Sequence, residues 1–292
     1  MADGALIDKR LMRRAFDRAA QSYDAAAVLQ HEVRGRMLER LDYIRHTPQA
    51  ILDAGTGTGG AIAALRERYP QAAVTALDIA PAMVARARER VPRWRRWIGL
   101  GGAPVHFVCG DIESLPLAAE SVGLVWSNLA LQWANDPARA FAEVKRVLAP
   151  GGLFMFSTFG PDTLKELRAA ATGIDGHTHV NRFVDMHDLG DLLVLGGFAT
   201  PVMDMEVVTL TYADARGLMR DLKAIGAHNV TAGRPAGLTG RARLAALEAN
   251  YERFRRDGRL PATFEVLYGH AWKPESRRTA DGKPIIPIRS QP

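Results

Sequence analysis

Residues 51–60 read Ile-Leu-Asp-Ala-Gly-Thr-Gly-Thr-Gly-Gly, and this stretch decides the fold of the 292-residue chain. An apolar run ends in Asp53, and three alternating glycines follow it: Gly55, Gly57 and Gly59. Apolar residues then repeat at helical spacing, at Ile62, Leu65 and Tyr69. This is the order of a strand, a tight turn and a helix. Glycine lets the backbone approach a ligand closely, and the helix start offers unpaired N–H groups. The stretch therefore predicts a site for a nucleotide-like molecule.

A second predicted strand does not yet identify that molecule. Gly55, Gly57 and Gly60 also satisfy the G-x-G-x-x-G spacing of dinucleotide-binding proteins. Residues 73–78 form an apolar strand that ends in Asp78, where a ribose ligand is expected. A dinucleotide and S-adenosylmethionine both contain a ribose, so Asp78 fits either, and a helix N-cap is its structural alternative.

The next predicted elements favour one cofactor. A strand from Val105 ends at Gly110-Asp111, where the acid can accept from an adenine amino group while Ile112 covers the ring. A further strand over 122–128 leads into a loop. An amphipathic helix over 139–148 is followed by Ala-Pro-Gly-Gly at 149–152 and by a strand over 153–158.

This ordered set resembles the class I S-adenosylmethionine-dependent methyltransferases over residues 50–158. The resemblance implies an α/β, Rossmann-like sheet of seven mostly parallel strands, and it places Asp53 near the methionine amino group of the cofactor. It assigns cofactor binding to these residues: Asp53, Gly55, Gly57, Gly59, Asp78, Ile79, Met83, Asp111, Ile112, Asn128 and Leu129.

The remainder of the chain is predicted to surround this core. Residues 1–45 are expected to form an N-terminal helical cap, in which Tyr23 is the candidate aromatic contact with the cofactor pocket. The methyltransferase domain spans 46–272, with a strand over 202–212, a helical insertion over about 212–260 and a last strand over 263–272. A helix over 162–171 is expected to be capped by Asp162 and Glu166. Residues 273–292 are expected to be a disordered tail.

The composition indicates which partners and which cellular compartment to expect. The net charge is +6, and arginines gather in two groups: Arg93, Arg95 and Arg96, and Arg10, Arg13 and Arg14. Such groups attract nucleic acid or an acidic protein, or simply form a solvated helix face. The single Cys109 is expected to be a buried structural thiol, which fits a reducing compartment. No apolar run approaches the ~20 residues of a membrane span. We expect a cytoplasmic protein.

Longer segments resemble a narrower family, the malonyl-[acyl-carrier protein] O-methyltransferases of biotin synthesis. They lie at 16–24, 110–117, 126–133 and 219–227. This resemblance implies methylation of the free carboxyl of a malonyl thioester, which starts pimeloyl formation. It also implies an acidic acyl carrier protein as partner for one arginine group, with no nucleic acid or membrane partner. A coenzyme A thioester stays open as the substrate.

Methylation of a carboxylate does not require a general base from the protein. A carboxylate with a pKa near ~4 is already ionised at pH 7, so the enzyme must mainly align oxygen, methyl and sulfur. Arg182 is the candidate bidentate partner of the substrate carboxylate, with Phe183 beside it and Tyr23 as a further catalytic candidate. His177 and His179 lack further ligands at metal-binding spacing, so no metal is expected.

Two alternatives stay open from the sequence. Residues 159–168 and 268–273 also resemble a mitochondrial complex I assembly factor that hydroxylates a protein arginine on the same fold. A non-catalytic adenosyl-binding module acting on RNA or protein is the third hypothesis, and the intact set of cofactor motifs argues against it.

Overall fold

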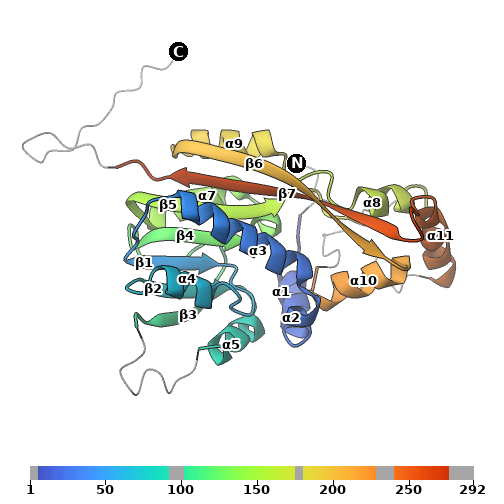
Figure 1. Cartoon of the computed structure of the whole chain (residues 1–292), viewed down its shortest axis with the longest axis horizontal. Coiled ribbons are helices and arrows are strands. Elements are labelled where there is room, and N and C mark those ends of the chain that lie inside the picture. Colours follow the sequence, from blue (N-terminus) through green and yellow to red (C-terminus); the bar gives the residue numbers. More distant parts are fainter. Residues whose placement is uncertain (1–5, 92–101, 175–179, 228–239, 276–292) are drawn as a thin grey trace, which may run out of the picture.

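The fold is a single seven-stranded sheet in the order β3-β2-β1-β4-β5-β7-β6 (Figure 1). The computed structural model describes residues 6–91, 102–174, 180–227 and 240–275. The strands are β1 (Ala50–Ala54), β2 (Ala73–Asp78), β3 (Val105–Cys109), β4 (Val122–Asn128), β5 (Leu148–Phe159), β6 (Ala199–Tyr212) and β7 (Leu260–Trp272). β7 is antiparallel to both of its neighbours, whereas β1 to β5 pair in parallel. The predicted class I methyltransferase sheet is confirmed.

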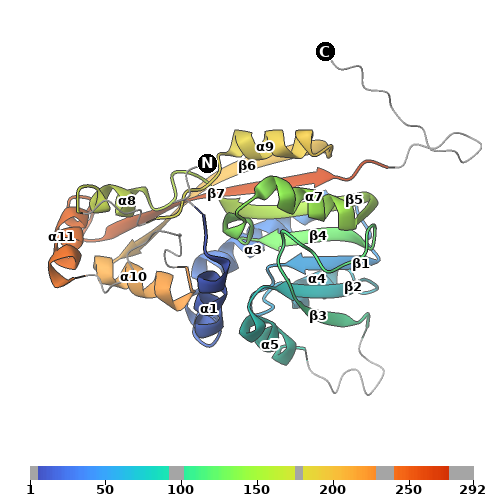
Figure 2. The same ribbon diagram turned by 180° about the vertical axis from the view of Figure 1, so that it is seen from behind.

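Helices cover both faces of the sheet and the carboxyl ends of its parallel strands (Figures 1 and 2). They are α1 (Lys9–Ala19), α2 (Tyr23–Ala26), α3 (Val28–Arg40), α4 (Ile62–Arg68), α5 (Pro81–Glu89), α7 (Pro137–Val147), α8 (Lys165–Ala171), α9 (Met186–Leu195), α10 (Ala215–Ala224) and α11 (Arg241–Glu252). α3 and α4 lie on one face and α7 on the other, while α8, α10 and α11 gather at the far end of the β6–β7 pair. As predicted, α10 and α11 lie in an insertion between β6 and β7. No helix in the described ranges is long and apolar enough to cross a bilayer.

Two apolar cores hold the layers together. The residues of α3 and α4 pack with Trp126 and Leu124 on one face of the sheet. On the other face, Phe141 of α7 meets Phe154 and Phe156 of β5, with ring centroids 5.5 and 5.6 Å away. Burying such rings supplies most of the stabilisation, because apolar surface removed from water contributes roughly 25 cal/mol per Å².

The start of α8 differs from the expected capping. The helix begins at Lys165 after Leu164, whose φ of 55° lies in the left-handed region, and Asp162 is ion-paired with Lys165 instead of capping. The Glu166 side chain is buried and accepts hydrogen bonds from both the backbone N–H and the hydroxyl of Thr263. This carboxylate joins α8 to β7, and that non-local partner outweighs the local capping pattern.

Two further expectations concern Cys109 and the start of the C-terminal tail. Cys109 is exposed, because it lies at the end of β3, the edge strand of the sheet. At the expected start of the tail, Lys273 is held in place: its ammonium donates to the Leu148 carbonyl oxygen at 2.7 Å and pairs with Glu120 at 3.1 Å. Residues 276–292 lie outside the described part of the chain. The division into cap, domain and tail stays a prediction.

Replacing Glu166 tests the α8–β7 connection. We expect Glu166→Ala to lower the free energy of unfolding by about 2–3 kcal/mol, because it leaves the buried Thr263 N–H without its acceptor. Lys165→Ala is the matched control: its exposed ion pair with Asp162 should contribute no more than about 1 kcal/mol. Urea denaturation measures both, and equal losses in the two variants would contradict this assignment.

Candidate active site

The glycine turn lies against the end of β2 and against the loop after β4. The amides of Gly55 and Thr56 both donate to the Leu77 carbonyl oxygen, at 2.8 and 2.9 Å. Gly55 has a φ of +79°, and a Cβ there would lie 2.3 Å from the Ala130 Cβ. Glycine is required at this position by both the backbone conformation and the lack of space.

The next two glycines have different surroundings. The Gly57 amide donates to the Asp78 carboxylate at 2.9 Å, and the Tyr23 ring lies 3.8 Å from where a Cβ would be. Gly59 packs against α5, where a Cβ would lie 2.9 Å from the Ala87 Cβ. Gly59 lines neither cavity described below, so its contribution is close packing of the turn.

Asp53 lies beneath this turn and is 2 % exposed. Burial raises the pKa of its carboxyl to about 7, although the Thr56 hydroxyl donates to it at 2.6 Å and opposes the shift. A small cavity of about 40 Å³ adjoins Asp53, and Arg34 of α3 also lines it. A buried acid that can ionise near neutral pH is suited to holding an ammonium group.

Unpaired polar atoms border the same small cavity. Among the described residues, the Gln30 side-chain oxygen and the Trp126 indole nitrogen are buried without hydrogen-bond partners. Such atoms are rare in folded proteins, and a bound ligand or water can supply their partners. The set fits the amino-acid end of S-adenosylmethionine: Asp53 and Gln30 would accept from its ammonium, and Trp126 and Arg34 would donate to its carboxylate.

The residues after β2 lie in a larger cavity. Asp78 is 9 % exposed; its two carboxylate oxygens accept from the amides of Gly57 and Ala80, both at 2.9 Å. Burial raises the pKa of Asp78 to about 6 against these hydrogen bonds. Ile79 and Met83 line the cavity beside it. Asp78 thus orders the turn while facing the expected ribose position.

The residues after β3 lie under the N-terminal helix. Asp111 and Ile112 line the large cavity, and Lys9 of α1 pairs with Asp111 at 3.1 Å and also with Glu113. The Glu113 amide donates to the Asp111 carboxylate at 3.0 Å. An adenine amino group would therefore meet an acceptor that α1 already neutralises in part.

Asn128 and Leu129 shape the loop after β4. The Asn128 amide donates to the Gln30 carbonyl oxygen at 3.1 Å and accepts from the Ser157 hydroxyl at 3.0 Å. Leu129 has a φ of 48°, and its amide donates to Ser157. Both residues line the large cavity, and the Asn128 side chain ties α3 to β5.

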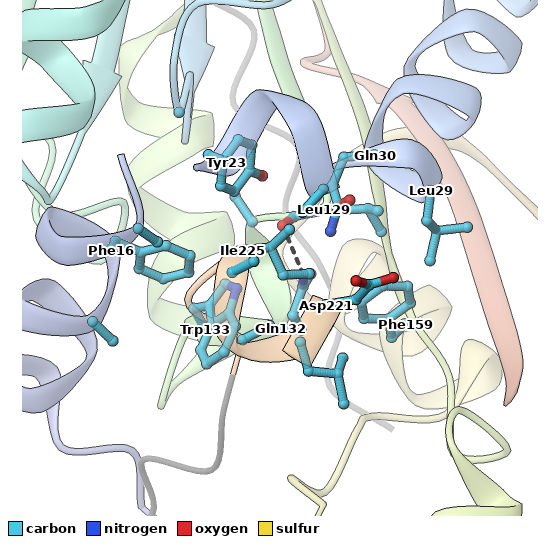
Figure 3. A pocket seen from close by; sticks show the side chains of 18 of the residues that line it. Phe16, Tyr23, Leu29, Gln30, Leu129, Gln132, Trp133, Phe159, Asp221 and Ile225 are labelled. Carbon is cyan, nitrogen blue, oxygen red and sulfur yellow. Dashed lines mark hydrogen bonds between the residues drawn. The ribbon is translucent and has the colours of Figure 1, made fainter. Parts of the chain in front are cut away.

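The large cavity has a volume of about 1500 Å³. Single-ligand pockets usually hold about 300–1,000 Å³, so it has room for a cofactor and a second substrate. One part lies beside Asp78 and Asp111, and the other extends under α10. Tyr23 lines both cavities, and Figure 3 shows it facing the same space as Gln30 and Leu129.

The other two catalytic candidates, Phe183 and Arg182, differ in whether they line the large cavity. Phe183 lines the large cavity and meets Phe159 with ring centroids 5.7 Å apart. Arg182 is exposed and is absent from the lining, although Asn181 and Phe183 on either side belong to it. His177, His179 and the arginines at 93, 95 and 96 lie outside the described residues. Within the described ranges no cluster of metal ligands occurs.

Sequence reasoning missed Lys9 and Arg34. Both lie on the N-terminal helices, and only the fold brings them to Asp111 and to the small cavity. The helical spacing of the apolar residues Leu29, Val33 and Met37 was available as a signal, since it leaves Arg34 at the edge of the buried face.

The sheet order and the acids at the ends of β1, β2 and β3 define the class: the chain is an S-adenosylmethionine-dependent methyltransferase of class I fold. A family model described as "Methyltransferase domain" matches residues 52–156. A putative methyltransferase from Bacillus halodurans has the same fold, with a TM-score of 0.57 at 19% identity over 81% of this chain and 97% of its own.

Relatives at higher identity define the family. A malonyl-[acyl-carrier protein] O-methyltransferase from Gallionella capsiferriformans is 59% identical over 281 residues, 96% of each chain. One from Methylovorus sp. is 58% identical over 292 residues, covering 100% of this chain and 97% of its own. The chain belongs to the malonyl-[acyl-carrier protein] O-methyltransferase family.

The raised pKa of Asp53 makes cofactor binding depend on pH. A pKa of about 7 leaves Asp53 mostly protonated at pH 6 and mostly ionised at pH 7.5, and only the ionised form pairs with an ammonium. The affinity for S-adenosylhomocysteine should therefore rise roughly eightfold over this interval, measured by calorimetry. In Asp53→Asn the affinity should be lower and this rise should disappear. A pH-independent affinity in the unmodified protein would remove Asp53 from ammonium binding.

Proposed function

We propose that this chain transfers the methyl group of S-adenosylmethionine to the free carboxylate of a malonyl thioester carried by an acyl carrier protein. The observation that carries the proposal is the continuous cavity of about 1500 Å³ that joins the cofactor residues to a second chamber under α10. Relatives of this name at 57–59% identity over nearly the whole chain support the same substrate. The methyl ester would start pimeloyl formation in biotin synthesis, and we place this reaction in the cytoplasm.

The acceptor needs no general base from the protein. Its carboxylate is ionised at neutral pH, since reference carboxyl pKa values lie near ~4. S-adenosylmethionine supplies an electrophilic methyl group on a positively charged sulfur. Burial, with Asp78 and Asp24 nearby, raises the pKa of Tyr23, so its hydroxyl stays protonated and is a donor for the acceptor. The protein then contributes position, which is the largest part of what a displacement of this kind requires.

Apolar walls support the chamber as the place of transfer. Leu129, Phe159 and Phe183 line it, and they exclude water from a reaction between two oppositely charged groups. The edge-on contact between Phe159 and Phe183 fixes the loop after α8 beside the chamber. Water excluded in this way cannot compete with the carboxylate for the methyl group.

A methyl-transfer assay tests the function and the assignment of Arg182. With radiolabelled cofactor and malonyl-carrier protein, we expect a product that gains one methyl and is hydrolysed as an ester. If Arg182 holds the carboxylate, Arg182→Ala should lower kcat/KM about tenfold or more, as for the loss of a charge-assisted hydrogen bond, with cofactor affinity retained.

Two outcomes would count against these assignments. Normal turnover in Arg182→Ala would remove that residue from carboxylate binding, in line with its exposed position outside the cavity lining. Absence of transfer by the unmodified protein, with cofactor binding intact, would favour the hydroxylase-like or non-catalytic hypotheses.

The outer face of α1 is our candidate surface for the carrier protein. Arg10, Arg13 and Arg14 are exposed there, and Arg13 is only weakly paired, with 4.0 Å to Asp17. On the opposite face of the same helix, Met12 and Ala15 line the large cavity. A carrier bound to the arginines would therefore lie next to the chamber that receives its substrate.

Charge reversal tests this surface. Arg10→Glu with Arg14→Glu should raise the KM for malonyl-carrier protein severalfold and make it less dependent on salt, because steering by exposed charges is screened by ions. The kcat should change little. Arg45→Glu is a control in the described chain outside α1. Because the double variant changes the net charge twice as much, a KM effect half as large in Arg45→Glu would assign the change to net charge alone.

A further inference from the structure

Three cations border the opening of the large cavity, and the methyl transfer proposed above does not require them. They are Arg18 at the end of α1, and Arg220 and Lys223 on α10. All three line the cavity and are exposed, whereas the deeper lining, such as Leu164 and Leu247, is buried. The cations therefore lie at the mouth of the cavity.

Contacts at the ends of the two helices bring the C-terminal ends of α1 and α10 together. The Ser22 hydroxyl, four residues after Arg18, donates to the carbonyl oxygen of Ala224 at 2.9 Å, and Ala224 directly follows Lys223. Gly226, just after α10, lies against Phe16 and Ala15 of α1, where a Cβ would come within 3.0 Å of the Phe16 ring. Arg220 and Lys223, three residues apart on a helix, are neighbours on its surface.

Within the described residues, the charge of these three cations is not neutralised by an ion pair. No described carboxylate forms an ion pair with Arg18, Arg220 or Lys223. The acid on the same stretch of α10, Asp221, hydrogen-bonds to Tyr212, and burial together with Asp221 raises the pKa of that phenol to about 12. The mouth thus presents three cations against one acid that already has a partner.

The cofactor does not require these cations, because its single anionic group fits the small cavity beside Arg34 and Trp126. The reacting carboxylate of the acceptor must lie in the interior, next to Tyr23 and Leu129. An anion at the mouth must therefore belong to the remote end of the acceptor. A malonyl thioester of phosphopantetheine has a neutral pantetheine arm that ends in a phosphoryl group, which matches this separation of charges.

We infer that Arg18, Arg220 and Lys223 bind the phosphoryl group at the end of a pantetheine arm whose malonyl thioester lies in the chamber. This inference rests on the proposed function and specifies the substrate of the same site. Arginine and lysine are the usual phosphate partners, and arginine holds phosphate oxygens in pairs. The phosphodiester of a carrier protein and the diphosphate of coenzyme A share this chemistry.

Thioesters of increasing length test the inference. Methyl transfer is compared for malonyl-pantetheine, malonyl-phosphopantetheine, malonyl-coenzyme A and malonyl-carrier protein. For the unmodified protein, kcat/KM should be about ten- to a hundredfold higher with malonyl-phosphopantetheine than with malonyl-pantetheine. In Arg220→Gln with Lys223→Gln this ratio should fall toward one, mainly through KM, and Arg18→Gln should lower it in part.

The control is Arg216→Gln, on the same helix but outside the cavity lining and paired with Glu248 at 2.5 Å. It should leave the ratio as it is. Calorimetry with phosphopantetheine and pantetheine, in the presence of S-adenosylhomocysteine, measures the same preference without methyl transfer. The two longer thioesters show whether the phosphoryl group is used from a carrier, from coenzyme A or from both.

Each outcome separates this inference from the proposed function. Transfer to malonyl-pantetheine and malonyl-phosphopantetheine at equal efficiency would overturn the phosphoryl assignment and leave the function intact. Loss confined to malonyl-carrier protein in the α10 variant would also overturn it, because the cations would then contact the carrier itself. A phosphoryl preference in binding without transfer to any malonyl thioester would support this inference and refute the proposed reaction.

Discussion

The approach of the glycine turn to β2 and to the loop after β4 is the constraint on which the rest of the site depends. Two amides of the turn share the Leu77 carbonyl oxygen, and a third donates to Asp78. The turn is thereby fixed between parallel strands, and Asp53 beneath it is almost fully buried. A carboxylate in such a place is costly when ionised, which is why its pKa lies near 7 until a cation is bound. The fold thus makes the site beside Asp53 favour a positively charged ligand.

The central sheet could be predicted because its signals are local. Each parallel strand is a short apolar run that ends in an acid or a glycine, and these signals do not depend on what packs against them. The predicted bounds were wrong where long-range pairing extends an element: β7 begins at Leu260 because Leu260 pairs with Tyr212. The cap of α8 failed for the same reason, since Glu166 bonds to Thr263, nearly a hundred residues away, instead of to its own helix.

The cofactor residues were predictable where the backbone itself forms the site, and less so where helices cover it. Asp53 and Asp78 lie near the ends of paired strands, and Asp111 follows the next strand, so the register of the sheet fixes their positions. Lys9 and Arg34 reach the site from separate helices. The apolar spacing of α3 places Arg34 at the edge of a buried face, but it does not show which site that face covers. Arg182 was predicted from its position in the sequence, but only its neighbours line the cavity. The direction of a single side chain in a loop depends on packing that a sequence motif does not determine.

The division of the site follows from how its two halves are built. The cofactor half uses residues at the ends of adjacent strands, which a sheet holds rigidly. The half that we propose for the acceptor is lined by residues of α1, α10 and the segment around Phe183. In the described part of the chain, the bond from Ser22 to the Ala224 carbonyl oxygen joins the ends of α1 and α10. Rigid strands suit a cofactor whose methyl must be aligned with the acceptor. Helices joined more loosely suit a long, thin substrate that has to thread between them. Under the proposed function, the strands would fix the position of the sulfur, whereas the helices would hold the flexible arm of the acceptor.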